Sequence, residues 1–447
     1  MTSVIIERGI MTNPEQADES LRAGRTVTGG STPLRPLVLT GLILGPAVAL
    51  GIGRFGYTLL LPTMRAYWGW SYATAGALNT ANAAGYLLGS FLAAPLASQI
   101  NLGRAFVAGL AVTAASVTLS GIDSPALFGT AHLWFQVVMR AAAGVSGAVT
   151  FVTGAGLISV TIPDPSRILA RYFGGAGLGI VAAAVVIPLV LAHGGPGAWR
   201  PGWFALGALA GLAAVLAVPV ARVRAPAMRA SGGGPPRRML GGLTSLLAGY
   251  TLFGLGYIAY MTFIVALLRD GGFSQNSVAV FWAVLGTAAA VGPSLWRRVI
   301  DRLSGARGLA LVMAVLAVGA ALPVVSLTLA AGIGSAVLFG SALLAVPTGI
   351  TAVTRRHVSP AGLTTALGLL TAGFAAGQLA GPLLTGTLAD TRGGIPFGLA
   401  VSAAILALGA VTFLIKKERF LCVPEPMPVP DSRQSAPSAQ GCTANKD

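Results

Sequence analysis

Apolar runs of about 20 residues alternate with short polar segments along most of the chain, and a run of that length lets an α-helix cross about 30 Å of hydrocarbon. Twelve such runs predict twelve membrane-spanning helices and an all-α membrane protein. The predicted spans are 37–61, 74–98, 103–121, 130–156, 170–192, 202–221, 240–268, 277–299, 308–329, 333–354, 361–387 and 395–415. An even number of spans places both ends of the chain on one side of the membrane.

The two halves of the chain repeat one another. A shift of 203 residues aligns glycine, tyrosine and serine positions without a gap. The matched pairs are Gly51 with Gly254, Gly53 with Gly256, Tyr57 with Tyr260, Gly69 with Gly272, Ser71 with Ser274 and Gly89 with Gly292. Because each copy consists of long apolar runs, the repeat predicts two pseudo-symmetric six-helix bundles, 36–221 and 240–415, with a site between them.

Three segments outside the spans have a different composition. Residues 222–239, with Ser231-Gly-Gly-Gly-Pro-Pro at their centre, resemble a flexible linker between the two halves. Residues 1–35 and 416–447 are polar, and we expect both to be disordered tails, because they cannot bury enough apolar surface to fold.

Composition supports the membrane assignment, since 54% of the residues are apolar and 9% are charged, against roughly 25% charged in soluble domains. The net charge of +16 comes mainly from arginines in the short segments between spans, so we expect no nucleic-acid partner. These arginines concentrate on the side of both termini, and the positive-inside bias makes that side cytoplasmic. Cys422 and Cys442 then lie in a reducing compartment, and their spacing suits no metal site.

Arg54 and Arg140 lie inside the first and fourth predicted spans, at similar depth. An arginine near mid-membrane costs about 2.5 to 3.5 kcal/mol even on lenient insertion scales, so each needs a partner. No Asp or Glu lies inside a predicted span, and we therefore expect the partner to be an anionic substrate, since the planar guanidinium suits carboxylate or phosphate. The alternative is that each arginine extends outward to the membrane surface, or binds backbone carbonyls and Gln136.

Further side chains within the spans are candidate contacts for that substrate. Tyr257, with Tyr260 beside it, lies opposite Arg54 in the repeat, and a cation facing an aromatic ring suits a small anion with an apolar or aromatic body. The candidate set is Arg54, Arg140, Tyr257, Tyr260, Asn79, Asn82, Gln136 and Gln378. The alternative for the tyrosines is ordinary packing, and for the amides it is hydrogen bonding between helices.

The segment after the eighth span reads Asp301-Arg302-Leu-Ser-Gly305-Ala-Arg307. It resembles, with one residue inserted, the Asp-Arg-x-Gly-x-Arg loop of the major facilitator superfamily, and the resemblance to that family covers nearly the full chain. In that family the loop helps to hold the cytoplasmic side closed. The residues for which this implies a gating role are Asp301, Arg302, Arg307 and Arg104, the last at the position of Arg307 in the first copy.

The first copy departs from the family pattern, because Ser98 and Gln99 stand where the second has Asp301 and Arg302. We therefore expect its part of the closure to be weak. Arg140-x-x-x-Gly144-x-x-Gly147 is similar to the Arg-x-x-x-Gly-x-Gly signature of the same family.

The run Gly53-Arg54-Phe55-Gly56-Tyr57 resembles the bacterial YbfB-like subgroup. The resemblance implies a multi-pass protein of the bacterial cytoplasmic (inner) membrane, with a midplane site lined by the first, fourth, seventh and tenth spans. Ser341 and Thr348 are the polar candidates on the tenth span, although such hydroxyls commonly bond to their own helix.

These observations predict a secondary active or facilitative transporter that moves a small organic anion by alternating access. One alternative is the efflux of lipophilic or drug-like compounds, and another is a non-transporting membrane sensor or scaffold. We expect a monomer whose partners are the lipid bilayer and the small anion.

The sequence contains no Gly-x-x-x-x-Gly-Lys-Ser/Thr segment that would cradle ATP phosphates, and no catalytic or metal-ligand cluster within the spans. We therefore expect no ATP hydrolysis, no enzyme activity, no cofactor and no metal. Asp390, at the outer end of the eleventh span, is the alternative proton site.

Overall fold

The computed structural model describes residues 35–122, 129–162, 164–195, 197–223, 237–303, 306–358, 360–391 and 393–415. Within these ranges the chain is helical and without strands, and 12 helical units are long and apolar enough to cross a membrane. This confirms the predicted all-α fold with twelve spans. The predicted tails and most of the predicted linker lie outside the described residues.

Each predicted span corresponds to one helical unit, and most units extend a few residues beyond the predicted limits. In the first half the elements are α2 (Pro36–Pro46), the π-helix η1 (Ala47–Ile52), α3 (Gly56–Trp68), α4 (Tyr72–Ile100), α5 (Leu102–Leu119), the short η2 (Gly129–Ala131), α7 (His132–Thr161), α8 (Ser166–Ala192), α9 (Trp199–Leu216) and η3 (Val218–Arg222). In the second half they are α10 (Arg237–Asp270), α11 (Gln275–Arg302), α12 (Ala306–Val325), α13 (Leu329–Leu343), α14 (Ala345–His357), α15 (Pro360–Ala389) and α16 (Gly394–Ile415).

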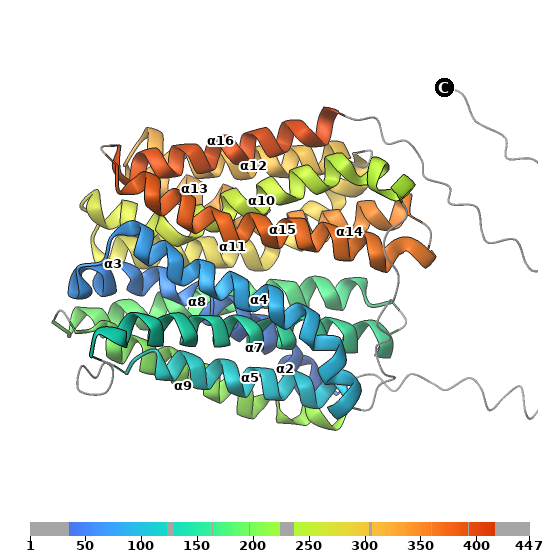
Figure 1. Ribbon diagram of the computed structural model, residues 1–447, viewed down its shortest axis with the longest axis horizontal. Helices are drawn as coiled ribbons and strands as arrows, with labels where there is room; N and C mark the ends of the chain where they lie inside the picture. The colour runs from blue at the N-terminus through green and yellow to red at the C-terminus, as the bar shows by residue number, and fades with distance from the viewer. Residues whose placement is uncertain are drawn as a thin grey trace, which may run out of the picture.

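The helices form two bundles that lie side by side, α2 to α9 in one and α10 to α16 in the other (Figure 1). The beginning of α2 and the end of α16 lie at the same end of the molecule, at the right in Figure 1, which we call the termini face; the opposite end is the distal face. The bundles meet where α3 contacts α10, α4 contacts α15 and α8 contacts α11.

The repeat is visible in local geometry. Gly69 and Gly272 both have positive φ, 66° and 83°, in the turn after a span, a conformation that a side chain disfavours. Two residues later Ser71 and Ser274 each cap the next helix, with the side-chain oxygen accepting a backbone N–H at 3.1 Å. The repeated Gly-x-Ser therefore encodes the same turn in both halves.

Two positions that the 203-residue shift relates touch each other directly. The Thr58 hydroxyl donates to the backbone carbonyl of Met261 at 2.7 Å, across the two bundles. Equivalent residues can meet only near the axis that relates the two copies, so α3 and α10 lie beside that axis.

Two spans are not continuous α-helices. In the first, Gly53 N–H bonds to Val48 O and Phe55 N–H to Leu50 O, the wider π pattern, and regular helix resumes only at Gly56. In the tenth, α13 ends at Leu343 and α14 begins at Ala345. Pro347 lacks the N–H that would bond to the Leu343 carbonyl, which accounts for the break.

Glycines allow several helices to approach backbone to backbone. A Cβ on Gly89 of α4 would lie 2.1 Å from the carbonyl oxygen of Val145 in α7, and one on Gly292 of α11 would lie 2.0 Å from that of Ser341 in α13. These two glycines are equivalent in the repeat, so both bundles use the same contact. Close approach of this kind contributes to stability in lipid, where no hydrophobic force drives helices together.

Replacing Gly89 with alanine tests this packing. We expect Gly89→Ala to destabilise the protein by about 1 to 3 kcal/mol, because α4 and α7 must move apart. The matched control is Gly211→Ala in α9, where a Cβ meets nothing within 4 Å. Thermal melting of the purified proteins in detergent measures both, and an equal melting temperature for the two variants would contradict the packing argument.

Candidate functional site

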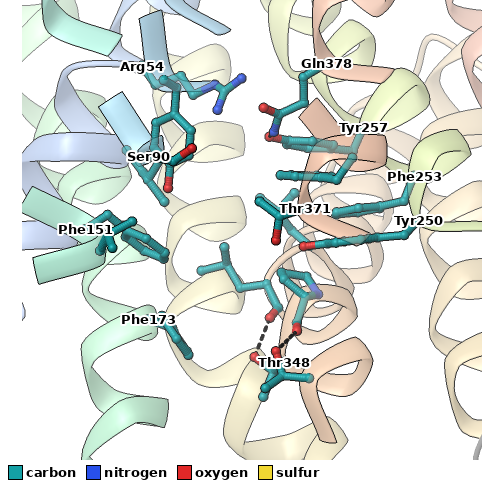
Figure 2. A pocket seen from close by; sticks show the side chains of 18 of the residues that line it. Arg54, Ser90, Phe151, Phe173, Tyr250, Phe253, Tyr257, Thr348, Thr371 and Gln378 are labelled. Atoms are coloured by element: carbon teal, nitrogen blue, oxygen red, sulfur yellow. Dashed lines mark hydrogen bonds between the residues drawn. The ribbon is translucent and has the colours of Figure 1, made fainter. Parts of the chain in front are cut away.

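A cavity of about 260 Å³ lies between the two bundles. Spans one, four, seven and ten contribute to it, as the family resemblance implies, and so do spans two, five and eleven. Its residues are Leu50, Arg54, Phe55, Tyr86, Ser90, Phe151, Val152, Phe173, Tyr250, Phe253, Tyr257, Leu343, Leu344, Pro347, Thr348, Thr351, Thr371, Phe374 and Gln378. Figure 2 shows Arg54 and Gln378 at one end of the cavity and Phe173 and Thr348 at the other.

Arg54 has the one charged side chain among the described residues that line the cavity. The residue is 1% exposed, and its Nε and Nη2 atoms have no hydrogen-bond partner among the described residues. Its guanidinium carbon lies 5.5 Å from the centre of the Tyr86 ring, a cation–π contact. The ring offers attraction but no acceptor in the plane of the guanidinium, so the donors of Arg54 stay available.

Arg140 of α7 is held quite differently. Its Nη1 donates to the carbonyl of Gly53 at 2.5 Å, and its Nη2 donates at 3.2 Å to both the carbonyl of Arg54 and Oδ1 of Asn79. Asn82 donates in turn to the backbone carbonyl of Arg140 at 3.0 Å. Arg140 is 1% exposed and is not one of the residues that line the cavity.

The break in the first span explains these bonds. Between η1 and α3 the carbonyls of Gly53 and Arg54 leave the regular helical pattern, and in a membrane every such group needs a partner within the protein. The forked guanidinium of Arg140 supplies two parallel donors. The ring of Tyr57, 4.8 Å from its guanidinium carbon, covers the group. Arg140 thus fixes the backbone that carries Arg54.

The wall opposite Arg54 is aromatic. Tyr250, Phe253 and Tyr257 follow one another along α10, with successive centroids 5.9 Å and 4.6 Å apart and planes within 14° of parallel. Phe374 of α15 stacks on Tyr250 at 4.6 Å. In Figure 2 the rings of Tyr250, Phe253 and Tyr257 face the cavity from the second bundle. Phe151 stacks at 5.4 Å on Phe173, on the side of the first bundle.

Gln378 completes the polar end of the cavity. Its Nε2 donates to the hydroxyl oxygen of Tyr257 in a short hydrogen bond, and its Oε1 is buried without a partner among the described residues. In Figure 2 the amide of Gln378 points toward the guanidinium of Arg54. The cavity therefore presents unused donors from one bundle and an unused acceptor from the other.

Three of the eight predicted contact residues line the cavity, namely Arg54, Tyr257 and Gln378. The other five are Arg140, Asn79, Asn82, Gln136 and Tyr260, which bond within or between helices outside it. Gln136 donates to the carbonyl of Ser120 at 3.0 Å, and Tyr260 bonds to Ser335 at 2.5 Å. Asn79 donates to Thr262 at 2.6 Å, across the two bundles.

The tenth span contributes Thr348 to the cavity but not Ser341. Both hydroxyls donate to their own helix, Thr348 to Leu344 O at 2.8 Å and Ser341 to Leu338 O at 3.0 Å. The lining also includes aromatic residues absent from the predicted contact set. Along α10, the spacing of Tyr250, Phe253 and Tyr257 is a helical stripe that the sequence displays.

On the distal side the bundles are tied by a carboxylate. Asp390, at the end of α15, accepts the backbone N–H groups of Tyr72 and Ala73 at 2.8 Å and 2.9 Å. These belong to the first turn of α4, where a negative charge is favoured by the helix dipole. The Tyr72 hydroxyl donates to Asp270 of the second bundle at 2.7 Å and accepts from Arg65 at 2.8 Å.

On the termini face the predicted gating acid pairs within its own bundle. Asp301 of α11 forms an ion pair with Arg356 of α14 at 2.5 Å, and both side chains are about half exposed. The three predicted gating arginines, Arg104, Arg302 and Arg307, are exposed. Their role in closure stays a prediction.

Comparison with known proteins agrees with the architecture. The fold is similar to a bacterial homolog of the human lysosomal transporter Spinster in an inward-facing, unoccupied conformation, with 17% identity, a TM-score of 0.66 and coverage of 86% of this chain and 97% of the other. The occupied inward-facing conformation of that homolog gives a TM-score of 0.67 at 17% identity, with the same coverage of 86% and 97%. A mutant of the nucleoside transporter NupG gives 0.65 at 14% identity, covering 85% of this chain and 99% of the other. Among curated proteins none matches.

In the part of the chain that the structure describes, twelve apolar helices form two repeated bundles around a central cavity, which is the fold of these solved transporters. The chain belongs to the family described as "Uncharacterised MFS-type transporter YbfB", which matches residues 46–414. This confirms the resemblance in the sequence motifs.

Replacing each buried arginine with glutamine separates their roles. We expect Arg140→Gln to lower the melting temperature, because each carbonyl left without its donor costs about 1 to 3 kcal/mol. Arg54→Gln removes a buried charge without breaking a hydrogen bond, so its melting temperature should equal or exceed that of the wild type. Thermal melting in detergent decides, and an Arg140→Gln protein as stable as the wild type would refute the structural role.

Proposed function

We propose that the protein transports a small organic anion with an aromatic or apolar body by alternating access. The observation that carries the proposal is the guanidinium of Arg54 at a cavity between the bundles, because its Nε and Nη2 atoms have no hydrogen-bond partner among the described residues. A permanently charged group there costs free energy until an anion shares its donors. A cationic compound would meet Arg54 with no acid among the described residues that line the cavity to offset it.

The remaining lining indicates the body of the cargo. Four stacked rings on one wall and the pair Phe151 and Phe173 on the other offer flat apolar surfaces. Drug-sized ligands occupy pockets of about 300 to 1,000 Å³, so a cavity of about 260 Å³ favours a smaller molecule. A compact aromatic carboxylate meets both conditions.

Efflux of lipophilic or drug-like compounds is the second candidate, because the aromatic lining would also hold a neutral apolar molecule. Transport of a neutral molecule would leave the charge of Arg54 without a role. The two candidates therefore predict opposite effects of cargo charge.

The distal closure supports alternating access. Three contacts join the bundles between the cavity and the distal face. They are the hydrogen bonds of Thr58 with Met261, of Asn79 with Thr262, and of the Asp390 carboxylate with the first turn of α4. The cavity extends from Arg54 toward Phe173, which lies near the beginning of α8 and thus toward the termini face. Rocking of the bundles would break the distal bonds and expose the cavity to the other side.

We assign the termini face to the cytoplasm of a bacterial inner membrane, because arginines gather in the segments on that face. No Asp, Glu or His is among the described residues that line the cavity. This supports facilitated diffusion, exchange, or proton movement on the anion itself.

Three probes with one body and different charges test the cargo class. Phenylacetate, phenylethylamine and 2-phenylethanol share a phenyl ring and differ in the polar group. We expect phenylacetate alone to raise the melting temperature of the purified protein, because a ligand stabilises the state that it binds. Proteoliposomes should exchange radiolabelled phenylacetate, and Arg54→Gln should abolish both effects.

The matched control is Arg171→Gln, which removes an exposed arginine of α8 and should leave binding and exchange unchanged. Stabilisation by 2-phenylethanol equal to that by phenylacetate would favour efflux of neutral compounds. If the Arg54→Gln variant still exchanged phenylacetate, the guanidinium of Arg54 would not be part of the cargo site.

Asp390→Asn tests the distal closure. The substitution removes the charge that faces the first turn of α4, and for an exposed acid such as Asp390 that interaction contributes about 0.3 to 1 kcal/mol. That shift changes the balance between closed and open distal sides by about twofold to fivefold. In Ser90→Cys protein, whose cysteine lines the cavity, a membrane-impermeant maleimide applied to intact cells should react faster by that factor.

The control for this experiment is Ser90→Cys with Asp164→Asn, which neutralises an exposed acid between α7 and α8 on the termini face. Its labelling rate should match that of Ser90→Cys alone. Identical rates for the Asp390 and Asp164 variants would mean that the carboxylate does not hold the distal side closed.

A further inference from the structure

Gln378 has an unused acceptor at the polar end of the cavity. Its Nε2 is engaged with the Tyr257 hydroxyl oxygen, and its Oε1 has no partner among the described residues although the side chain is 1% exposed. A buried amide oxygen without a donor costs free energy, because it has lost its hydrogen bond to water without gaining another. A cargo that supplies that donor would recover this free energy.

The charge of Arg54 supports this orientation of the amide. Turning the amide over would point its NH₂ group, rather than its oxygen, toward the guanidinium at the same end of the cavity (Figure 2). Two sets of donors would then face each other without an acceptor between them. With Oε1 toward Arg54, the cavity end carries donors on one side and an acceptor on the other.

Tyr257 adds a second donor. Its oxygen accepts from Gln378, so its own O–H hydrogen is directed elsewhere, and the ring lines the cavity. The polar end thus offers Arg54 and the Tyr257 hydroxyl to an anion, and Gln378 Oε1 to a donor. A cargo with a carboxylate alone would accept hydrogen bonds from Arg54 and the Tyr257 hydroxyl, and it would leave Gln378 Oε1 without a donor.

We propose that the cargo carries a neutral hydrogen-bond donor beside its carboxylate, as in an aromatic 2-hydroxycarboxylate, and that Gln378 Oε1 is the residue atom that selects for it. This rests on the proposed transport of an organic anion. The carboxylate binds Arg54 from the first bundle and the hydroxyl donates to Gln378 from the second. Cargo would therefore bridge the two bundles through its polar head.

The donor is a hydroxyl or a neutral N–H rather than an ammonium group. An ammonium placed at Gln378 would lie beside the guanidinium of Arg54, and like charges in a buried site repel strongly. The described lining residues include no acid that would offset the second positive charge. Zwitterionic amino acids are therefore excluded by the same geometry that accepts hydroxy acids.

A series of ligands on one phenyl body tests the selection by isothermal calorimetry on the purified full-length protein. Phenylacetate has no donor, each mandelate enantiomer has a 2-hydroxyl, O-methylmandelate blocks it, and 2-phenylglycine replaces it with an ammonium. We expect the better mandelate enantiomer to bind about threefold to tenfold more tightly than phenylacetate. O-methylmandelate should lose that gain, and 2-phenylglycine should bind more weakly than phenylacetate.

The variant Gln378→Leu should bind mandelate and phenylacetate with equal affinity. Mandelate no tighter than O-methylmandelate on the wild type would overturn the role of Gln378 and leave the anion site intact. A mandelate preference that survives in Gln378→Leu would also overturn it. If neither phenylacetate nor mandelate binds the wild type, the anion site itself fails, and this inference fails with it. The wild-type series decides even if the leucine variant does not fold.

Discussion

The bonds between Arg140 and the broken first span are the interaction on which the site depends. In a membrane, carbonyls that leave the helical pattern must find donors inside the protein. Arg140 supplies two of them to Gly53 and Arg54, and Asn79 and Asn82 fix Arg140 in turn. The break then orients the side chain of Arg54 into the cavity, where two of its nitrogens have no partner among the residues that the structure describes. Arg140 therefore has a structural role, and the proposed function assigns Arg54 to the cargo.

This arrangement makes a symmetric scaffold asymmetric at its centre. The 203-residue shift relates Arg54 to Tyr257, and both line the cavity from opposite bundles. The seventh span, which is the counterpart of the first, is one continuous helix, α10. Helix α13 belongs to the tenth span, the counterpart of the fourth, and it has no arginine that could bind backbone carbonyls of the seventh span as Arg140 binds those of the first. The first copy therefore contributes charge and the second contributes stacked rings and an amide. Such a division suits a cargo with one charged end and one flat apolar body.

Much of the fold could be predicted from the sequence because hydrophobic length and glycine–serine turns are local signals. The twelve spans followed from hydrophobic length, and the repeated Gly-x-Ser marked equivalent positions in the two halves, which the structure shows to be capped turns. The roles of Arg54 and Arg140 could not be separated, since both look alike as lone arginines at mid-membrane. Their difference arises from the π-helix after Pro46, a backbone feature without a clear sequence pattern. The aromatic stripe from Tyr250 to Tyr257 is visible in the sequence. Whether it faces the cavity or a neighbouring helix depends on how the helices pack, which the sequence does not display.

The most direct measurement is an electron cryomicroscopy structure of the protein in lipid nanodiscs, determined with and without a bound aromatic carboxylate. We expect Arg140 to bind the carbonyls of Gly53 and Arg54 in both states. We expect Arg54 to have no protein carboxylate beside it in the ligand-free state and to bind the ligand carboxylate in the other. Density that shows Arg54 paired with a protein acid, or the ligand carboxylate bound to Arg140 instead, would contradict the proposed division of roles between the two arginines.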